Sequence, residues 1–294
     1  MDQRIAFIGF GEAGSAVVSG WKDVPDIRVF DIKTDYEAQR PAMLSRYQEF
    51  GVAGRMSAAE AVQNADLVFC TVTADQAAIA AGNCAPHMKP GALWLDLNSC
   101  APSTKKSAAE TVEAAGARYV DVAVMAPVYP KRNMVPLLLA GPHAETVKPL
   151  LEALPMSPRV VEGPVGSASS IKMIRSIMMK GMEALTAECV LAAVRAGVDE
   201  EVLASLQASN PEIDWKARSS YNFERSLQHG IRRAAEMREV VKTVSDLGFA
   251  PDMASATVEW QDRMGGLGLG AEVSEELDYR EIAAKITQRM MAGN

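Results

Sequence analysis

The sequence has little of what disulfide-rich, metal-binding or nucleic-acid-binding proteins require. Its 294 residues include four cysteines and three histidines. No two cysteines form a C-x-x-C pair and the histidines are scattered, so we expect reduced thiols and no metal site. The net charge of −7 and the lack of a basic run argue against nucleic-acid binding.

Long apolar runs are also missing. No stretch is long enough to span a bilayer, and the first apolar strand begins within a few residues of the N-terminus. We therefore expect no membrane span, no signal peptide and a cytoplasmic protein. Hydrophobic residues still make up 48% of the chain, which is enough for a proper core. The length allows one large domain or two of ordinary size.

A glycine-rich turn near the start carries the clearest functional signal. The apolar run Ile5–Ile8 is followed at once by Gly9-Phe10-Gly11-Glu12-Ala13-Gly14 and then by a helical pattern. In dinucleotide-binding proteins the first glycine permits a tight turn, the second admits a pyrophosphate, and the third lets helix and strand pack closely. The helix N-terminus then offers N–H groups and partial positive charge to the phosphates.

An acidic residue follows the second expected strand. Asp31 comes directly after Ile27–Phe30 and lies 20 residues beyond Gly11, where a carboxylate can hold the adenosine ribose hydroxyls. A carboxylate there repels a 2′-phosphate and favours NAD, while Lys33 leaves NADP possible. The alternative, a glycine turn in some other α/β protein, is disfavoured because the whole strand–turn–helix–strand–acid pattern is present.

Strands and helices alternate through residues 1–162, as a parallel α/β sheet requires. Ser57 and Glu60 form a capping box that predicts a helix start, and Asp66–Val72 indicates the strand that follows. Further strands are expected at 92–97, 118–124, 135–140 and 159–161, with helices at 102–115 and 143–154. We therefore predict an N-terminal Rossmann dinucleotide-binding domain over residues 1–162.

The pattern changes after residue 162. From Ser167 to about Ala196, Gly181 is the only glycine or proline, and helical spacing predicts one helix of about 45 Å. Its recurring apolar positions are Ile171, Ile174, Met178, Met182, Leu185, Cys189 and Ala192. Other helices are expected at 200–208, 223–247, 252–264 and 275–292. We predict an all-α substrate and dimerisation domain, residues 163–294, joined by the long helix.

Lys172 is the best candidate for a catalytic side chain. A nicotinamide cofactor supplies hydride chemistry, but the protein must move a proton, so a proton donor–acceptor is expected where the domains meet. Lys172 lies one to two turns into the long helix, just after Gly163–Gly166. Ser176 shares its face, which Arg175 and Lys180 flank. On spacing alone, a solvent-facing lysine is the more ordinary interpretation.

The chain resembles the β-hydroxyacid dehydrogenase family, which includes 3-hydroxyisobutyrate and tartronate semialdehyde reductases and the related 6-phosphogluconate dehydrogenases. Besides the glycine turn, Asp96–Pro102 resembles the family's Ser-Thr-x-x-Pro segment near the nicotinamide. Gly163–Ser176 resembles its G-x-x-G-x-x-x-x-x-K-x-x-x-N segment. The resemblance covers nearly the whole chain. It implies that Lys172 is the general acid in reduction and the general base in oxidation, and it implies a homodimer or homotetramer.

The glycine motif, the strand ends and the resemblance together give a set of expected cofactor-binding residues. These are Gly9, Phe10, Gly11, Glu12, Ala13, Gly14, Asp31, Thr71, Val72, Thr73, Asn98 and Ser99.

The substrate segment departs from the family pattern. The family's Asp-x-Pro-Val-Ser-Gly-Gly corresponds to Asp121–Pro127, which has Met125 and Ala126 in place of the serine and a glycine. The expected asparagine is Ser176, and the family's Lys-Asp pair is Arg238-Glu239. These changes resemble a divergent branch whose C-terminal domain is described as phosphogluconate-dehydrogenase-like and of unknown function.

A polar helical stretch can replace the lost contacts. His229, Arg232 and Glu236 recur at helical spacing, and arginine binds carboxylates or phosphates through its planar fork. The ordinary alternative is a solvated face with internal ion pairs. The expected substrate contacts are Met125, Ala126, Arg175, Ser176, His229 and Arg232.

The sequence thus predicts a two-domain NAD(P)-dependent oxidoreductase. Hydride moves between the nicotinamide and a small hydroxy acid or its oxo form, and Lys172 handles the proton. The expected partners are this small molecule and further copies of the chain, with no nucleic acid and no membrane. Alternatives are an imine-reducing or decarboxylating dehydrogenase, or a non-catalytic NAD-binding sensor.

Overall fold

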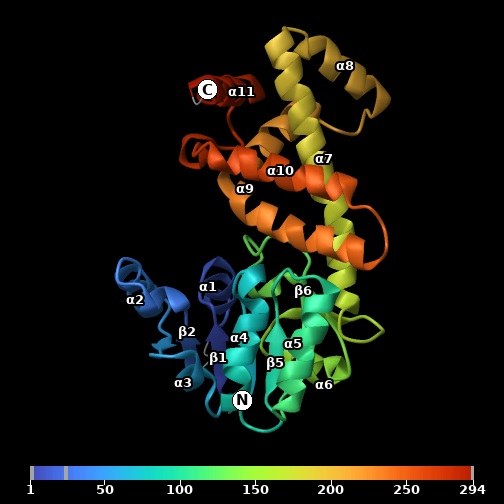
Figure 1. Ribbon diagram of the computed structural model, residues 1–294. Coiled ribbons are helices and arrows are strands. Elements are labelled where there is room, and N and C mark those ends of the chain that lie inside the picture. The colour runs from blue at the N-terminus through green and yellow to red at the C-terminus, as the bar shows by residue number, and fades with distance from the viewer. Residues whose placement is uncertain (1–2, 23–25, 293–294) are drawn as a thin grey trace. The chain divides into compact units, whose positions relative to one another are not determined.

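The chain folds into an α/β unit followed by a helical unit. The computed structural model describes residues 3–22 and 26–292. Internal contacts divide the chain into two compact units, Met1–Met173 and Ile174–Asn294. Strands occur in the first unit, whereas the described regular elements of the second are all helices (Figure 1).

An eight-stranded sheet forms the centre of the first unit, in the order β3-β2-β1-β4-β5-β6-β7-β8. Its strands are β1 (Ile5–Ile8), β2 (Ile27–Phe30), β3 (Ala53–Gly54), β4 (Leu67–Cys70), β5 (Leu93–Asp96), β6 (Arg118–Val124), β7 (Pro136–Ala140) and β8 (Ser157–Val160). Apolar side chains alternate between its two faces: Ile5 and Phe7 join one buried cluster, and Ala6 and Ile8 join the other. Burial on both faces explains the continuous apolar runs of the central strands.

One neighbouring pair of strands breaks the parallel pattern. β6 and β7 are antiparallel, while the other paired strands run parallel to each other. The sheet is thus mostly parallel, as the alternation of strands and helices predicts, with this one antiparallel pair as an exception. The connection between these strands contains only a short 3-10 helix, η4 (Arg132–Met134), and a parallel return needs a longer crossover, usually with an α-helix.

Helices cover the sheet of the first unit. They are α1 (Glu12–Ser19), α2 (Arg40–Glu49), α3 (Ala58–Val62), α4 (Ala77–Cys84), α5 (Pro102–Ala114), α6 (Ala144–Ala153) and the start of α7 (Ser167–Ala196). Short 3-10 helices are η1 (Ile32–Asp35), η2 (Ala74–Gln76) and η3 (Ala85–His87). The predicted capping box is confirmed at α3, where the Glu60 N–H donates to Ser57 Oγ at 3.2 Å and Glu60 Oε2 accepts the Met56 N–H at 3.1 Å.

The second unit consists of the rest of α7 with α8 (Asp199–Ser209), α9 (Trp215–Asp246), α10 (Asp252–Gly266), η5 (Gly270–Glu272) and α11 (Tyr279–Ala292). The predicted all-helical region is confirmed. α9 begins at Trp215, earlier than the expected residue 223, because the Asp214 side chain accepts the Ala217 N–H at 3.0 Å and caps the helix.

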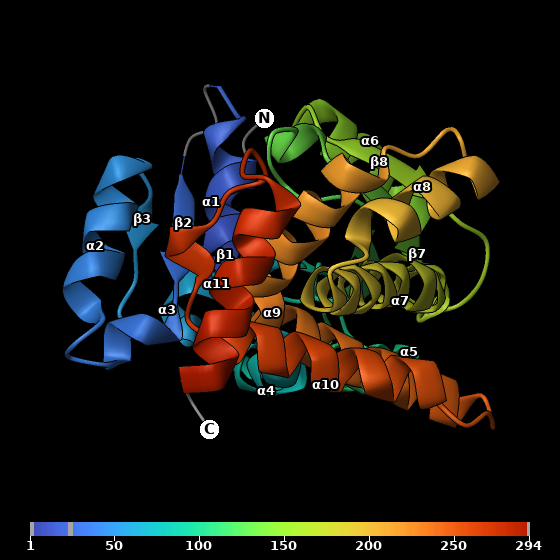
Figure 2. The same cartoon turned by 90° about the horizontal axis from the view of Figure 1, so that it is seen from above.

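Two glycines let α9 and α10 approach closely. The helices lie side by side in Figures 1 and 2. A Cβ built on Gly230 of α9 would lie 2.4 Å from the Gln261 carbonyl oxygen and 2.7 Å from the Gly265 Cα, both in α10. Any side chain at Gly230 would therefore have to push the two backbones apart.

The apolar pattern of α7 lies partly on an exposed face. The predicted helix is confirmed, but Met178 is 62% and Leu185 71% exposed, and Ile174 and Met182 are exposed as well. Helical residues on another face, such as Ala184 and Ala187, are buried in the core of the second unit. The periodicity therefore indicates the helix correctly without telling a buried face from an exposed one.

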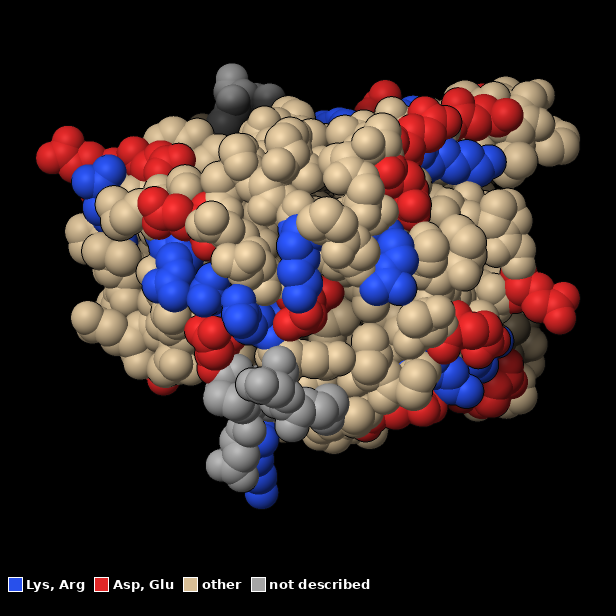
Figure 3. All heavy atoms as spheres, turned by 90° about the horizontal axis from the view of Figure 1, so that it is seen from below, with Lys and Arg blue, Asp and Glu red and all other residues tan. Residues whose placement is uncertain are grey.

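Charged side chains of both signs are interleaved over the face of the molecule shown in Figure 3. Among the described residues, no helix combines the length and the apolar character that a membrane crossing requires.

Candidate functional site

The glycine turn between β1 and α1 has the shape that a dinucleotide requires. Gly9 has φ +84°, and a Cβ there would lie 2.7 Å from the Thr71 carbonyl oxygen. A Cβ on Gly14 would lie 3.0 Å from the Gly9 carbonyl oxygen, whereas one on Gly11 would meet no atom within 4 Å. The backbone at Gly11 thus borders open space at the start of α1, where a pyrophosphate fits.

Asp31 is held against this turn at the end of β2. Its Oδ2 accepts the Phe10 N–H at 2.8 Å, and its Oδ1 accepts the Lys33 N–H at 3.0 Å. The Asp31 N–H donates to the Tyr47 hydroxyl at 2.8 Å. Burial and the neighbouring Asp31 carboxylate raise the pKa of Tyr47, so this hydroxyl stays protonated. The carboxylate is therefore fixed beside the open space at the turn.

The end of β4 lies beside the same turn. The Thr71 N–H donates to the Ile8 carbonyl at 2.8 Å, and the Thr71 hydroxyl donates to the Gly9 carbonyl at 2.7 Å. Val72 is half-buried and Thr73 is exposed. The structure thus brings three of the expected cofactor-binding segments together at the carboxyl ends of neighbouring strands.

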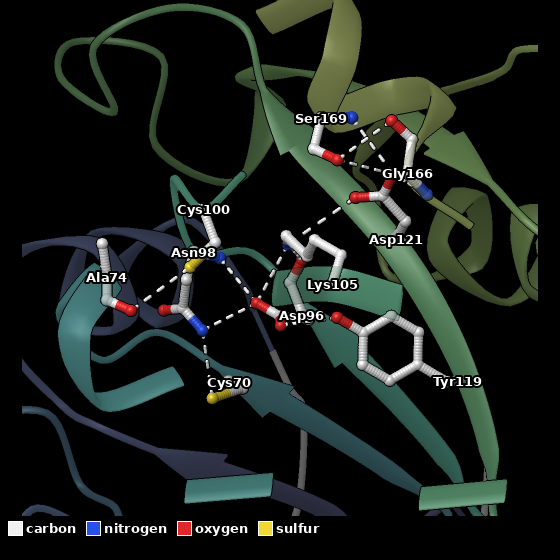
Figure 4. Close-up of polar contacts among 10 residues, drawn as sticks. All are labelled: Cys70, Ala74, Asp96, Asn98, Cys100, Lys105, Tyr119, Asp121, Gly166 and Ser169. Carbon is white, nitrogen blue, oxygen red and sulfur yellow. Dashed lines mark hydrogen bonds and ion pairs between the residues drawn. The ribbon is translucent and has the colours of Figure 1, made fainter. Parts of the chain in front are cut away.

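Asn98 and Ser99 follow β5, and their side chains differ in role. Asn98 is buried, and its Nδ2 donates to Asp96 Oδ1 at 2.7 Å and to Cys70 Sγ at 3.2 Å (Figure 4). Ser99 is half-buried. The Asn98 side chain therefore anchors the loop internally, and this leaves Ser99 as the more accessible of the two.

A buried charged network lies behind this loop. Asp96 of β5 and Asp121 of β6 are register partners on adjacent strands, and Lys105 of α5 reaches between them (Figure 4). Lys105 Nζ lies 3.0 Å from Asp96 Oδ1 and 3.6 Å from Asp121 Oδ1, and it donates to the Asp96 carbonyl at 2.5 Å. All three side chains are at most 1% exposed. Buried ion pairs through Lys105 thus join β5 to β6.

The two carboxylates of this network keep Lys105 in its charged form. Burial alone lowers the pKa of Lys105, but attraction to Asp96 and Asp121 outweighs it, so the pKa is raised and the ammonium persists. The Tyr119 hydroxyl donates to Asp96 Oδ2 at 2.6 Å, and burial holds its pKa well above the ordinary value.

Asp121 connects the network to the start of α7. Its Oδ2 accepts the Gly166 N–H at 3.0 Å, the Ser169 N–H at 3.1 Å and the Ser169 hydroxyl at 3.2 Å. Lys172 follows Ser169 by one helical turn and is half-buried. A carboxylate within β6 therefore fixes the helical turn that precedes the candidate catalytic lysine.

Sequence reasoning missed Lys105 and Tyr119. The available signal was a pair of aspartates in two predicted neighbouring strands, Asp96 near the end of one and Asp121 within the other, with lysines in the helix between them. The capping of the start of α7 by Asp121 was also missed, because Gly166 and Ser169 lie far from Asp121 in the sequence.

The expected substrate residues lie in different surroundings. Met125 and Ala126 follow β6, and both are half-buried against the core of the first unit. On α7, Arg175 is exposed and Ser176 is buried.

In the second unit, the expected polar stretch lies on α9. His229 is half-buried, and exposed Arg232 pairs with Glu236, with Nη1 and Oε1 3.6 Å apart. Glu236 also accepts from Lys180 Nζ at 2.6 Å. Burial lowers the pKa of Lys180, and the Glu236 carboxylate only partly offsets this. Glu236 is thus shared by two cations.

Sequence reasoning missed a buried ion pair beside this stretch. Arg233, adjacent to Arg232, pairs with Glu183 of α7. Helical spacing alone does not tell which of two adjacent arginines faces a neighbouring helix.

Comparison with known proteins identifies the family. Residues 4–161 match the NAD binding domain of 6-phosphogluconate dehydrogenase. The chain belongs to this family. Residues 193–264 of this family member also match a domain of unknown function, DUF1932. The expected resemblance and the Rossmann fold of the first domain are thereby confirmed, and the chain is an NAD-binding member of the hydroxyacid dehydrogenase group of oxidoreductases.

Individual relatives agree with this assignment. The mitochondrial 3-hydroxyisobutyrate dehydrogenase of Mus musculus is 25% identical over 265 residues, covering 86% of this chain and 76% of the relative. A conserved hypothetical protein from Sinorhizobium meliloti 1021 is 35% identical, with TM-score 0.76 and coverage of 98% and 97%. The 3-hydroxyisobutyrate dehydrogenase of Mycobacterium tuberculosis, 18% identical with TM-score 0.70 and coverage of 97% and 99%, shares the fold.

Proposed function

We propose that this chain catalyses hydride transfer between NAD and a small hydroxy acid or its oxo form, with Lys172 as the acid–base residue. The observation that carries the proposal is the position of Lys172, one turn after the Gly166–Ser169 turn that Asp121 fixes beside the β5 and β6 ends. The curated 3-hydroxyisobutyrate dehydrogenases among the relatives act on a compound of this class by name.

Each proposed group has a separate role. A bound nicotinamide supplies the hydride donor or acceptor. Lys172 gives a proton to the substrate oxygen in reduction and takes it back in oxidation. Its place near the N-terminus of α7 disfavours the ammonium form by about 0.3–1 kcal/mol, which assists proton donation.

We assign the cofactor to the residues that border the glycine turn. Gly9–Gly14 with the start of α1 hold the pyrophosphate, and Asp31 accepts from the adenosine ribose hydroxyls. Thr71–Thr73 and the Asn98–Ser99 loop border the remainder. Because both Asp31 oxygens are held in place by backbone N–H groups, its negative charge stays where a 2′-phosphate would lie, which favours NAD over NADP.

Substrate contacts are assigned to Met125, Ala126 and Ser176, and to cations that suit an acid group. Arg175 and Arg232 are exposed arginines able to bind a carboxylate through a planar fork. Half-buried His229 completes the proposed set.

Two copies of the chain are proposed to pair through the exposed apolar face of α7. This face carries apolar side chains at helical spacing, namely Ile174, Met178, Met182 and Leu185. The opposite side of the helix packs in the core of the second unit, so α7 is apolar on both sides. A helix with apolar residues all round is normally covered on all sides. A second copy supplies a matching face, because a two-fold interface repeats the same surface on both partners.

The function is tested by a screen followed by substitution of Lys172. Hydroxy acids, oxo acids and cyclic imines are offered with NAD(H) or NADP(H), and absorbance of the reduced cofactor is followed. Lys172→Ala should lower turnover by about 10²–10⁴-fold, the usual contribution of a general acid–base group. Cofactor affinity, measured by calorimetry, should be unchanged.

Two further variants sharpen this test. Lys172→Arg keeps the positive charge but cannot exchange a proton near neutral pH, so it should be as inactive as the alanine variant. Lys148→Ala removes a partly exposed lysine of α6 and should leave turnover unaltered. Undiminished turnover in Lys172→Ala would refute the assignment, and cofactor binding without turnover on any compound would favour a sensor.

A further inference from the structure

Lys105 is a fully buried lysine whose partners belong to separate segments of the first unit. Its Nζ lies 3.0 Å from Asp96 Oδ1 and 3.6 Å from Asp121 Oδ1 (Figure 4). Because these aspartates are register partners on adjacent strands, their carboxylates are forced into proximity in a region closed to water. Like charges in such a position repel unless a cation lies between them.

Each carboxylate also holds a functional segment. Asp96 Oδ1 accepts the Asn98 backbone N–H at 2.9 Å and the Asn98 Nδ2 at 2.7 Å, which fixes the loop that carries Ser99. Asp121 Oδ2 accepts N–H groups of Gly166 and Ser169 at the start of α7. One ammonium group therefore offsets the repulsion between the two anchoring carboxylates on either side of it.

We propose that Lys105 is a positioning residue: its ammonium lies between Asp96 and Asp121 and offsets their repulsion, which fixes the Ser99 loop and the α7 turn before Lys172 in one arrangement. The catalytic consequence rests on the function proposed above. The offset of this repulsion and the fixing of the two segments do not depend on it, so they can be tested separately.

Loss of the Lys105 charge should change how the stability of the folded chain depends on pH. Within the described part of the chain, the ionisable groups that act on Lys105 and its partners include the Tyr119 hydroxyl and the Cys100 and Cys70 thiols, and these three supply no positive charge. Without the ammonium, burial and mutual repulsion would raise the pKa of one carboxyl above its value in the unfolded chain. A raised carboxyl pKa stabilises the folded state at low pH, and this contribution is lost as pH rises.

The experiment compares K105M with Y119F in the full-length chain. Y119F removes a hydrogen bond to Asp96 without changing a charge. Chemical unfolding is measured between about pH 5 and pH 8, where one additional bound proton changes the unfolding equilibrium constant by about tenfold per pH unit. The loss of stability in K105M relative to the native chain should grow with pH. The loss in Y119F should stay constant.

A double variant covers the case in which K105M does not fold. K105M/D96N removes one positive and one negative charge together and so ends the repulsion between the two carboxylates, and it should fold with a weaker pH dependence than K105M. Hydrogen exchange of segments 97–101 and 163–171 should be faster in K105M at pH 8 than in the native chain, and near-native in Y119F. A stability loss in K105M that is independent of pH, native exchange in both segments, or a pH dependence in the double variant as steep as that of K105M would overturn the proposal.

The activity screen and the pH dependence of stability test the proposed function and the positioning role of Lys105 separately. If the native chain turns over no compound in the screen, that function fails, whereas the pH dependence of the stability loss in K105M is still expected. If the native chain is active, K105M at pH 8 should lose kcat more than cofactor affinity, because Lys172 itself is intact but its helical turn is no longer fixed.

Discussion

At the scale of single residues, Asp31 is the residue that we propose sets the cofactor preference. Its carboxylate is held in place by N–H groups of Phe10 and Lys33. Asp31→Asn keeps an acceptor for only one of these two N–H groups, and it removes the negative charge that we propose repels a 2′-phosphate. We expect the ratio of NADP to NAD affinity to rise by about tenfold or more, which calorimetric titration with both cofactors measures.

Asp35 provides the matched control for this change. It is an exposed acid in η1, directly after β2, and Asp35→Asn alters the net charge equally. The cofactor preference of the Asp35→Asn variant should remain that of the native chain. An unchanged ratio in Asp31→Asn would show that this carboxylate does not contact the ribose.

The same scale shows where sequence reasoning ends. Gly9, Gly14 and Asp31 were predictable, because their roles follow from local backbone geometry and fixed spacing. Lys105 was not, because α5 carries two adjacent lysines, Lys105 and Lys106, and only the positions of the β5 and β6 ends determine which one is buried.

At the scale of elements, the close crossing of α9 and α10 depends on Gly230. A Cβ there would contact backbone atoms of α10, which have no flexible side chain to move aside. Gly230→Ala should therefore lower the free energy of unfolding by about 1–3 kcal/mol, the usual cost of overpacking, as measured by denaturant titration.

Gly266→Ala is the control at the end of α10. A Cβ at Gly266 would meet no atom within 4 Å, so this variant should be neutral or slightly stabilising. If both variants lose the same stability, the cost lies in helix conformation and not in the crossing.

Element types were largely predictable, while their directions and faces were less so. The boundaries of α7 followed from its composition between residues 167 and 196. The reversal of β7 was not predicted, although no helix was expected between the strands at 118–124 and 135–140. Nor was the exposure of Met178, because an apolar stripe has the same spacing whether a core or another chain covers it.

At the scale of the whole molecule, the apolar face of α7 predicts the assembly state. Met178→Glu places a charge in the middle of this face, where it would be buried without a partner in a dimer. We expect the native chain to sediment as a dimer or tetramer and the variant to shift toward monomer at equal concentration. Analytical ultracentrifugation measures both.

A charge elsewhere on the molecule should have no such effect. Ile79→Glu alters an exposed apolar residue of α4 in the first unit and should leave the sedimentation unchanged. A native chain that remains monomeric at high concentration would contradict the pairing through α7.

The margins of the sheet limit how copies can join. At one margin β3 is only two residues long, and at the other β8 contains Pro158, which has no N–H to donate. Short edge strands and edge prolines prevent further strands from adding to a sheet. A continuous sheet running from one copy into the next is therefore blocked at both margins. Assembly must use side chains instead of backbone pairing, and this also protects a strongly apolar sheet from uncontrolled growth.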